Sequence, residues 1–566
     1  MIAANWETIR NRKLAEQRSQ LRQEWLIPES QLPSDNVSDV TDIPKTCGIL
    51  SSRELKITDS YDARGLAEAI RAKIYTAVEV TAAFCKRAAI ANQLTSCLTE
   101  CLFDSAVARA AFLDAHLDRT GQTLGPLHGL PISVKDTFDI EGIDSSVGIS
   151  ALAFHPAQDN APIIDTLLAA GAVIHCKTNV PQSMLALDSV NNIFGRVLNP
   201  RNRRRWTAGG SSGGEAVLVA MKGSVMGVGT DVGGSIRIPA FVNGVVGFKP
   251  GKGRISDKGL TTGQLPAAGK VGLESCVGPI ACTIEDLGLF MEVVEHGRMW
   301  EVDPEVKAEE GWWTRSPDPA LPLRTKVQEE KPLRIGILPS NGVTSPLPPV
   351  TSSLHRLTGL LQTHKDIQTI PLDPHTTAFS QCQSLSNKFF SAEGGAHLLS
   401  LIHSTSEPLI PWLSTRLRPK TPATLTHFRA LLAQKSALST RLLRSIWVDH
   451  DIDLLICPVA PHPVPPPDAW NAVGYTSAFV LLDWPAGVAQ VGRVRREDLQ
   501  AEMEGKEVKG GWDRVNRGLW DERFREGYVG SWMAVQVVAP PGRERRCWEG
   551  MKLLERVVAG GERARL

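Results

Sequence analysis

The sequence predicts an α/β protein with a largely parallel sheet covered by helices, and three observations lead to that fold class. Short apolar runs typical of buried strands alternate with segments of helical periodicity along most of the chain. Hydrophobic residues make up 42% of the 566 residues and charged residues 22%, which is ordinary for a globular protein. Glycine (48) and proline (37) together stay well below the roughly 25–30% of low-complexity chains, so whole-chain disorder, collagen and fibres are excluded.

The N-terminal part is predicted to be a helical arm. Residues 5–26 are rich in Lys, Arg, Glu and Gln, which predicts a polar helix, and a proline-containing loop follows it. Helical signals dominate 62–118, where Thr76 and Glu79 have the spacing of a capping box. We therefore expect residues 1–60 to form an arm laid over the body of the protein.

Strand and helix signals alternate from residue 130 to the end of the chain. The expected elements are strands at 130–134, 172–176, 225–229, 333–338 and 532–539, and helices at 161–170, at 214–222, from 283 onward and at 547–558. Three segments look like insertions or linkers instead of core: 298–332, the proline cluster 458–467 and the charged run 492–529.

The charge balance and the apolar runs exclude several kinds of partner. With 62 Lys and Arg against 61 Asp and Glu, the net charge of +1 gives no global field that recruits nucleic acid or an anionic membrane. The basic run 203–205 is short and typical of a solvated loop. No apolar run reaches 18 residues and the N-terminus lacks a signal-peptide core, so we expect no membrane span and, by default, a cytoplasmic location.

Ten cysteines are spread thinly along the chain, and no CxxC pair occurs among them. Cys97 and Cys101 share a helical face by spacing, but no histidine or second cysteine pair lies near enough in sequence to complete a zinc site. We expect free thiols in a reducing compartment, no metal and no organic cofactor.

The most informative segment is 209–235, in which nine of 27 residues are glycine. Glycine at that density costs backbone entropy, but it suits a chain that turns tightly and brings bare N–H groups up to a ligand. Two Gly/Ser clusters flank an apolar helix and strand, which a plain linker does not need. The backbone N–H groups of Val232, Gly233, Gly234 and Ser235 are candidates for an oxyanion hole.

Two other motif readings compete in this region. The GGSSGG cluster at 209–214 contains GxSxG, the nucleophile elbow of α/β-hydrolases, with His450 or His462 as its downstream base, but no oxyanion motif precedes it. The run 171–178 nearly matches a Walker A loop, but Cys176 occupies the place of the second glycine. We reject nucleotide binding there.

Three ordered motifs, GPLHGLPISVKD at 125–136, TAGGSSGGE at 207–215 and GTDVGGSIRIPA at 229–240, resemble the amidase signature family. The resemblance covers roughly residues 61–559, with its catalytic core at about 125–260 and a probable insertion at 492–529. It implies a single large mixed, mostly parallel central sheet with helices on both faces. The segments VGIS at 147–150 and LLDWPAG at 481–487 look most like the fungal acetamidase or general-amidase branch.

The resemblance implies a Ser–Ser–Lys triad. Ser235 matches the nucleophile that forms an acyl-enzyme, and Lys135 matches the base. Ser211, which the family holds at a cis peptide between flanking Gly210 and Gly213, would relay the proton between them.

Two charged residues bracket the nucleophile. Asp231 and Arg237 are expected to pair or to bond the loop backbone and so to fix its shape, with ordinary surface charge as the alternative. A lysine side chain in water titrates at about 10.4, so Lys135 can act as a base at neutral pH only if burial lowers its pKa to about 7.

The resemblance implies an amidase that hydrolyses a small-molecule carboxamide to a carboxylate plus ammonia or an amine. An amidotransferase-type subunit that passes ammonia to a partner, an esterase with the same triad and a non-catalytic scaffold stay open as alternatives, and so does a homodimer. The sequence departs from the family pattern at Trp206, Ala216 and Cys282, none of which belongs to the triad.

Overall fold

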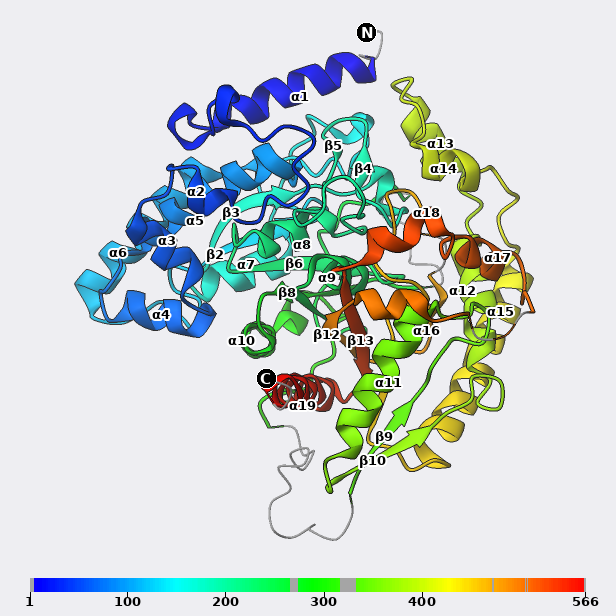
Figure 1. The fold of residues 1–566 in the computed structure, drawn as a ribbon. Coiled ribbons are helices and arrows are strands. Elements are labelled where there is room, and N and C mark those ends of the chain that lie inside the picture. Colours follow the sequence, from blue (N-terminus) through cyan, green and yellow to red (C-terminus); the bar gives the residue numbers. More distant parts are fainter. Residues whose placement is uncertain are drawn as a thin grey trace.

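The computed structural model describes residues 5–264, 273–315, 332–470, 473–503, 505 and 507–563. Within these residues one sheet of 11 strands runs through the molecule and is flanked by helices (Figure 1). Its order is β1-β3-β2-β6-β8-β7-β12-β13-β11-β9-β10, and β4 and β5 form a separate two-stranded sheet. The strands are β1 (Leu98–Cys101), β2 (Pro131–Lys135), β3 (Val173–Thr178), β4 (Val190–Asn191), β5 (Gly195–Arg196), β6 (Met226–Asp231), β7 (Val246–Lys249), β8 (Cys276–Ala281), β9 (Leu333–Ile337), β10 (Ile367–Pro371), β11 (Leu454–Pro458), β12 (Ala486–Arg493) and β13 (Trp532–Val538).

The helices lie between and around these strands. They are α1 (Trp6–Gln20), α2 (Ile43–Thr46), α3 (Ser52–Asp59), α4 (Ala63–Arg71), α5 (Ala77–Thr95), α6 (Phe103–Thr120), α7 (Pro162–Ala169), α8 (Gly213–Ala220), α9 (Arg237–Asn243), α10 (Ile284–His296), α11 (Pro348–Gln362), α12 (Cys382–Phe390), α13 (Ala396–His403), α14 (Pro411–Arg416), α15 (Leu425–Leu442), α16 (Gly474–Leu481), α17 (Gly511–Gly518), α18 (Glu522–Arg525) and α19 (Glu544–Arg563).

Helices cover both faces of the sheet, as neighbouring residues of β7 illustrate. A Cβ on Gly247 would meet Ile236 and Ala240 at α9, whereas Phe248 packs against Trp313, which itself contacts Trp548 of α19. Successive residues of a strand point to opposite faces, so α9 and α19 lie on opposite sides of the sheet. The expected helical cover on both faces is confirmed.

The expected large mixed sheet is confirmed, but the expectation that it is mostly parallel is wrong. Six of the ten strand pairings in the sheet are antiparallel, and four are parallel. The parallel set includes β3-β2-β6, whose strands are connected through α7 and α8 as crossovers. The consecutive pairs β7–β8 and β12–β13 instead run antiparallel. Apolar periodicity marks each strand but does not fix its direction.

Most of the expected elements occur near their expected positions. The helices predicted at 161–170 and 214–222 are α7 and α8, and the helix predicted from 283 onward is α10, whose cap Thr283 accepts a hydrogen bond from the N–H of Asp286. The capping box of Thr76 and Glu79 is present at the start of α5.

Residues 458–465 of the proline cluster are buried, so the expectation that this segment is an insertion or linker instead of core is wrong. Val459, Ala460 and Val464 belong to the hydrophobic core around α9. Proline lacks an N–H that burial would leave unsatisfied, and the carbonyl of Pro465 accepts a hydrogen bond from the N–H of Thr207 at 2.9 Å. The segment therefore packs against the loop that leads into the GGSSGG cluster.

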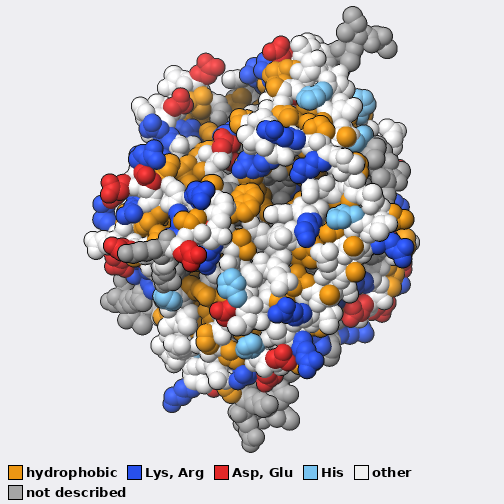
Figure 2. All heavy atoms as spheres, turned by 90° about the vertical axis from the view of Figure 1, so that its right-hand side faces the viewer, with side chains coloured by type: hydrophobic (Ala, Val, Ile, Leu, Met, Phe, Trp, Pro, Cys, Tyr) orange, Lys and Arg blue, Asp and Glu red, His pale blue; other side chains and the backbone are white. Residues whose placement is uncertain are grey.

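The surface carries charges of both signs. Figure 2 shows Lys and Arg side chains interspersed with Asp and Glu side chains and with scattered apolar ones over one face of the molecule. In the part of the chain that the structure describes, no helix is long and apolar enough to cross a bilayer.

Candidate active site

Lys135 ends strand β2, and its ammonium group points toward the GGSSGG segment. Its Nζ lies 2.7 Å from Ser211 Oγ and 2.8 Å from Thr230 Oγ1, and the side chain is completely buried. Strand β6, which carries Thr230, pairs in parallel with β2. The sheet therefore brings Lys135 next to Thr230, and the turn before α8 brings the first serine of the predicted triad to the lysine across 76 residues of sequence.

Burial determines the protonation of Lys135. Removal from water disfavours the ammonium form and lowers the pKa of Lys135 to about 7, although the carboxylates of Asp231 and Glu215 act in the opposite direction. A lysine with this pKa is available as a neutral amine near neutral pH, as a base at this position requires.

Ser211 lies in the turn that enters α8, and the Gly210–Ser211 peptide bond is cis, as expected. The flanking glycines are needed for space. A Cβ on Gly210 would stand 2.8 Å from the carbonyl oxygen of Ala186, and one on Gly213 would stand 2.4 Å from Ser189 Oγ. A side chain at Gly210 would therefore collide with the backbone of residues 186–188, and one at Gly213 would collide with the Ser189 side chain.

Ser235 lies in the turn between β6 and α9, which we call the nucleophile turn (residues 231–237). The N–H of Ser212 donates a hydrogen bond to the carbonyl of Ser235 at 3.1 Å, so the two Gly/Ser clusters are in direct backbone contact. Ser211 and Ser235 are both buried. The three predicted triad residues therefore converge on one place at the ends of β2 and β6.

Asp231 and Arg237 form a buried two-pronged ion pair across the nucleophile turn. Arg237 Nε and Nη2 donate to the two carboxylate oxygens of Asp231 at 2.9 Å each, and both side chains are fully buried. Burial alone would raise the pKa of Asp231, but the Arg237 guanidinium outweighs it and lowers the pKa. The alternative of ordinary surface charge is wrong for this pair.

The backbone donors of the nucleophile turn are not equivalent. The N–H of Gly234 already donates to Asp231 Oδ1 at 2.7 Å, which removes it from the expected set of oxyanion donors. Among the residues that the structure describes, nothing accepts a hydrogen bond from the N–H groups of Val232, Gly233 or Ser235. These three remain free to meet an anionic oxygen.

Sequence reasoning missed two polar groups beside the triad. Thr230 binds Lys135 from β6, and Glu215 lies buried on α8, where it accepts hydrogen bonds from the hydroxyls of Ser133 and Thr178. Burial raises the pKa of Glu215 to about 7. A glutamate in the first turn of an apolar helix was a visible signal of a buried role, whereas a threonine inside a strand carried none.

The geometry supports neither alternative interpretation of the motifs, the GxSxG nucleophile elbow or the Walker A loop. His462 is buried against Trp470 and His450 binds the carbonyl of Ser445, and neither bonds to a serine of the 209–214 cluster within the described residues. Lys177, in the Walker-like run, is buried and donates to the carbonyl of Asp144 and to Ser145 Oγ. Within the described residues no group of three His, Cys, Asp or Glu side chains could hold a metal.

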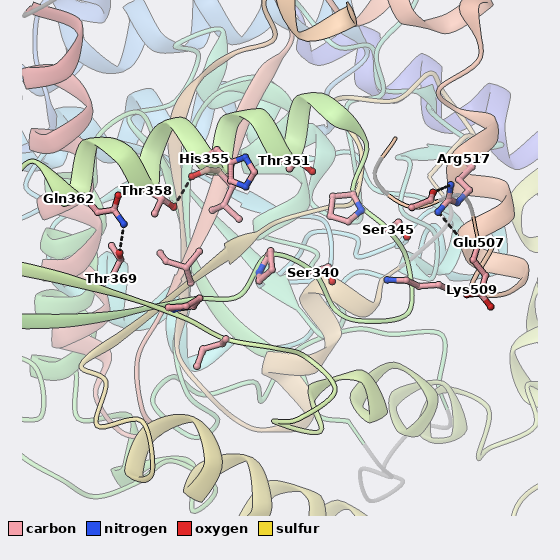
Figure 3. A pocket seen from close by; sticks show the side chains of 17 residues that line it. Ser340, Ser345, Thr351, His355, Thr358, Gln362, Thr369, Glu507, Lys509 and Arg517 are labelled. Carbon is pink, nitrogen blue, oxygen red and sulfur yellow. Dashed lines mark hydrogen bonds between the residues drawn. The ribbon is translucent and has the colours of Figure 1, made fainter. Parts of the chain in front are cut away.

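A separate pocket of about 750 Å³ lies away from the triad, between α11, the strands β9 and β10, and Gly505, Glu507, Lys509 and Arg517 (Figure 3). Its lining includes Ser340, His355 and Lys509 but none of Lys135, Ser211 and Ser235. Part of the charged run 492–529 therefore borders this pocket.

Comparisons with known proteins agree on one family. A family model described as Amidase matches residues 79–548. A putative amidase, kk1C, of Curvularia clavata is 37% identical over 514 residues, which is 88% of each chain. An acetamidase of Emericella nidulans is 33% identical over 96% of each chain. Among solved structures, a fatty acid amide hydrolase superposes with a TM-score of 0.86 at 25% identity and covers 98% of this chain and 95% of its own.

Proposed function

Because this chain belongs to the amidase signature family and is therefore a hydrolase that acts on amides, we propose that it cleaves a carboxamide through Ser235, Ser211 and Lys135. The products are a carboxylate and either ammonia or an amine. The observation that carries the proposal is the 2.7 Å contact between the buried Lys135 amine and Ser211, in a segment bonded to the Ser235 backbone.

The proposed first step moves a proton from Ser235 to Lys135. Neutral Lys135 accepts the proton of Ser211 while it donates to Thr230, and Ser211 in turn accepts the proton of Ser235. Ser235 Oγ then attacks the amide carbonyl and forms a tetrahedral intermediate. When this collapses, the C–N bond breaks, the proton returns through Ser211 to the leaving nitrogen, and an acyl-enzyme remains on Ser235. A water molecule, deprotonated by the same relay, releases the carboxylate.

The negative oxygen of the tetrahedral intermediate needs donors that are fixed in advance. We assign this role to the N–H groups of Val232, Gly233 and Ser235, which no described residue occupies. Such fixed donors stabilise the transition state more than the ground state, because charge develops on the oxygen only during attack.

Acetamide is the first substrate to examine, since two relatives at 32–33% identity carry the name acetamidase.

The ten cysteines are all free thiols, which supports a reducing compartment such as the cytoplasm as the place of action.

The test is ammonia release from acetamide and a panel of larger amides by the purified chain alone. We expect Ser235→Ala, Ser211→Ala and Lys135→Ala each to lower kcat by at least about 1,000-fold, since the proton relay works as a unit. Ser340→Ala, in the separate pocket, should keep wild-type activity. Full activity in Ser235→Ala would contradict the proposal. A strict need for a copurifying partner would instead favour the amidotransferase-type reading, and turnover of esters only would favour an esterase.

A further inference from the structure

The peptide unit between Gly233 and Gly234 is held at both of its ends. The carbonyl of Gly233 accepts a hydrogen bond from Thr476 Oγ1 at 2.5 Å, and the N–H of Gly234 donates to Asp231 Oδ1 at 2.7 Å. Thr476 comes from α16, 243 residues further along the chain. The peptide that precedes Ser235 by one residue is therefore fixed on one side by Asp231, at the end of β6, and on the other by Thr476 of α16.

The two holding groups are connected to one another. Arg237, which pairs with Asp231, donates from Nη1 to Gln536 Oε1 at 2.6 Å. Gln536 Nε2 donates to the carbonyl of Tyr475 at 3.0 Å, and Tyr475 precedes Thr476. These hydrogen bonds, together with the peptide link between Tyr475 and Thr476, form a closed ring. It runs from Gly233 through α16 and Gln536 of β13 to the Arg237–Asp231 pair and back to Gly234.

Close approach of Thr476 depends on the absence of a side chain at Gly234. Gly234 has φ +128°, and a Cβ there would stand 2.4 Å from Thr476 Oγ1 and 2.7 Å from Ile238. Two consecutive glycines allow many backbone conformations, so the unit between them would reorient easily without such contacts. The hydroxyl of Thr476 has only one proton. Its other acceptor, the carbonyl of Val473, lies further away at 3.1 Å.

We propose that Thr476 is a positioning residue of the nucleophile turn: its hydroxyl fixes the Gly233–Gly234 peptide so that the neighbouring N–H groups of Val232, Gly233 and Ser235 face one oxygen. This inference rests on the proposed function, because it assigns Thr476 a role in the same reaction. Without the hydroxyl, the buried carbonyl of Gly233 loses its hydrogen bond to Thr476 and the turn can reorient. The N–H donors are then less well placed for the transition state, so the chemical step slows, while substrate binding is unchanged.

The experiment compares Thr476→Val, Thr476→Ser and Ser477→Ala with the wild type. The readouts are the rate at which a fluorophosphonate labels Ser235, and kcat and KM for an amide that the wild type cleaves. Thr476→Val should lower the labelling rate and kcat by about 10- to 100-fold at unchanged KM. Thr476→Ser, which keeps the hydroxyl, should restore most of both. Ser477→Ala removes a buried hydroxyl of the same helix that has no hydrogen-bond partner among the residues that the structure describes, and it should match the wild type.

If Thr476→Val is labelled as fast as the wild type, the positioning role is overturned. It is also overturned if Thr476→Ser is labelled as slowly as Thr476→Val, since packing alone would then explain the loss. If the valine variant does not fold, as judged by thermal unfolding, Thr476→Ala carries the same expectation. No labelling of Ser235 in the wild type would instead refute the proposed function itself, so the two failures are distinguishable.

Discussion

Lys135 owes its low pKa to burial alone, because both nearby carboxylates, on Asp231 and Glu215, favour its ammonium form. Asp231 is neutralised by Arg237, whereas the hydrogen-bond partners of Glu215 among the described residues are the hydroxyls of Ser133 and Thr178. Glu215 is therefore the group through which the pKa of Lys135 can be altered without disturbing the nucleophile turn.

The pH dependence of the reaction should follow the protonation of the Lys135 amine. Since the neutral amine is the active form, kcat/KM should rise with pH around 7 and level off above it. Glu215→Gln removes an anion that stabilises the ammonium, so the pKa of Lys135 should fall and the midpoint should move to lower pH. The control is Glu295→Gln. Glu295 is also a buried carboxylate, but it accepts hydrogen bonds from the N–H groups of Trp313 and Thr314 and contacts none of the triad residues. A midpoint that stays or moves upward in Glu215→Gln would contradict the account.

The candidate oxyanion donors include both contacts that local sequence encodes and contacts that it does not. Asp231 and Gly234 stand three residues apart, a spacing at which an aspartate side chain commonly accepts a backbone N–H, so the loss of Gly234 as a donor was predictable. The roles of Thr476 and Gln536 were not, because their partners lie 243 and 299 residues away and no local pattern encodes such contacts.

At the scale of elements, α1 is held to the body by a buried cation. Lys13 Nζ lies 2.8 Å from Glu100 of β1 and 2.7 Å from Asp144, and Gln17 donates to the carbonyls of Leu98 and Thr99. Figure 1 shows α1 running along the outside of the molecule. The polar helix expected at 5–26 is present, but its low apolar content gave no sign that a lysine would be its buried anchor.

Lys13→Ala should loosen this attachment. Removing one partner of a buried ion pair costs about 3–5 kcal/mol, and Glu100 would then be a buried carboxylate without its cation. Hydrogen exchange in α1 and β1 should speed up markedly, while β6 stays protected. Lys45→Ala, which breaks an exposed pair with Asp42, is the control and should change little.

The defect of Lys13→Ala should also depend on pH. Burial raises the pKa of Glu100 to about 7 even with Lys13 present, and loss of the cation raises it further. A carboxyl whose pKa is raised by folding binds its proton more tightly in the folded state, so stability falls as pH rises through that range. The variant should therefore be closer to the wild type at pH 6 than at pH 8. Equal defects at both values would show that Glu100 does not carry the effect.

At the scale of the whole molecule, the sheet gathers a site from motifs that are separated in sequence. Local signals located β2, α8 and β6 and, with the family resemblance, the residues at their ends. They did not give the antiparallel pairings on both sides of β7, because strand direction depends on long connections and on partners far along the chain. The core of the site lies at the ends of the parallel strands β2 and β6 and in the turn before α8, and its residues were predictable because the motifs at 125–136, 207–215 and 229–240 coincide with these elements.

The central claim is that Ser235 is a nucleophile activated by Lys135, and the most direct measurement is mass-spectrometric mapping after exposure to a fluorophosphonate. The wild type and Lys135→Ala are treated in parallel, and Lys252→Ala, a partly exposed lysine paired with Glu274, serves as the control. We predict an adduct on Ser235 in the wild type and the control, and none in Lys135→Ala. An adduct on Ser212 that survives Lys135→Ala would contradict the Ser–Ser–Lys relay and indicate a GxSxG nucleophile instead.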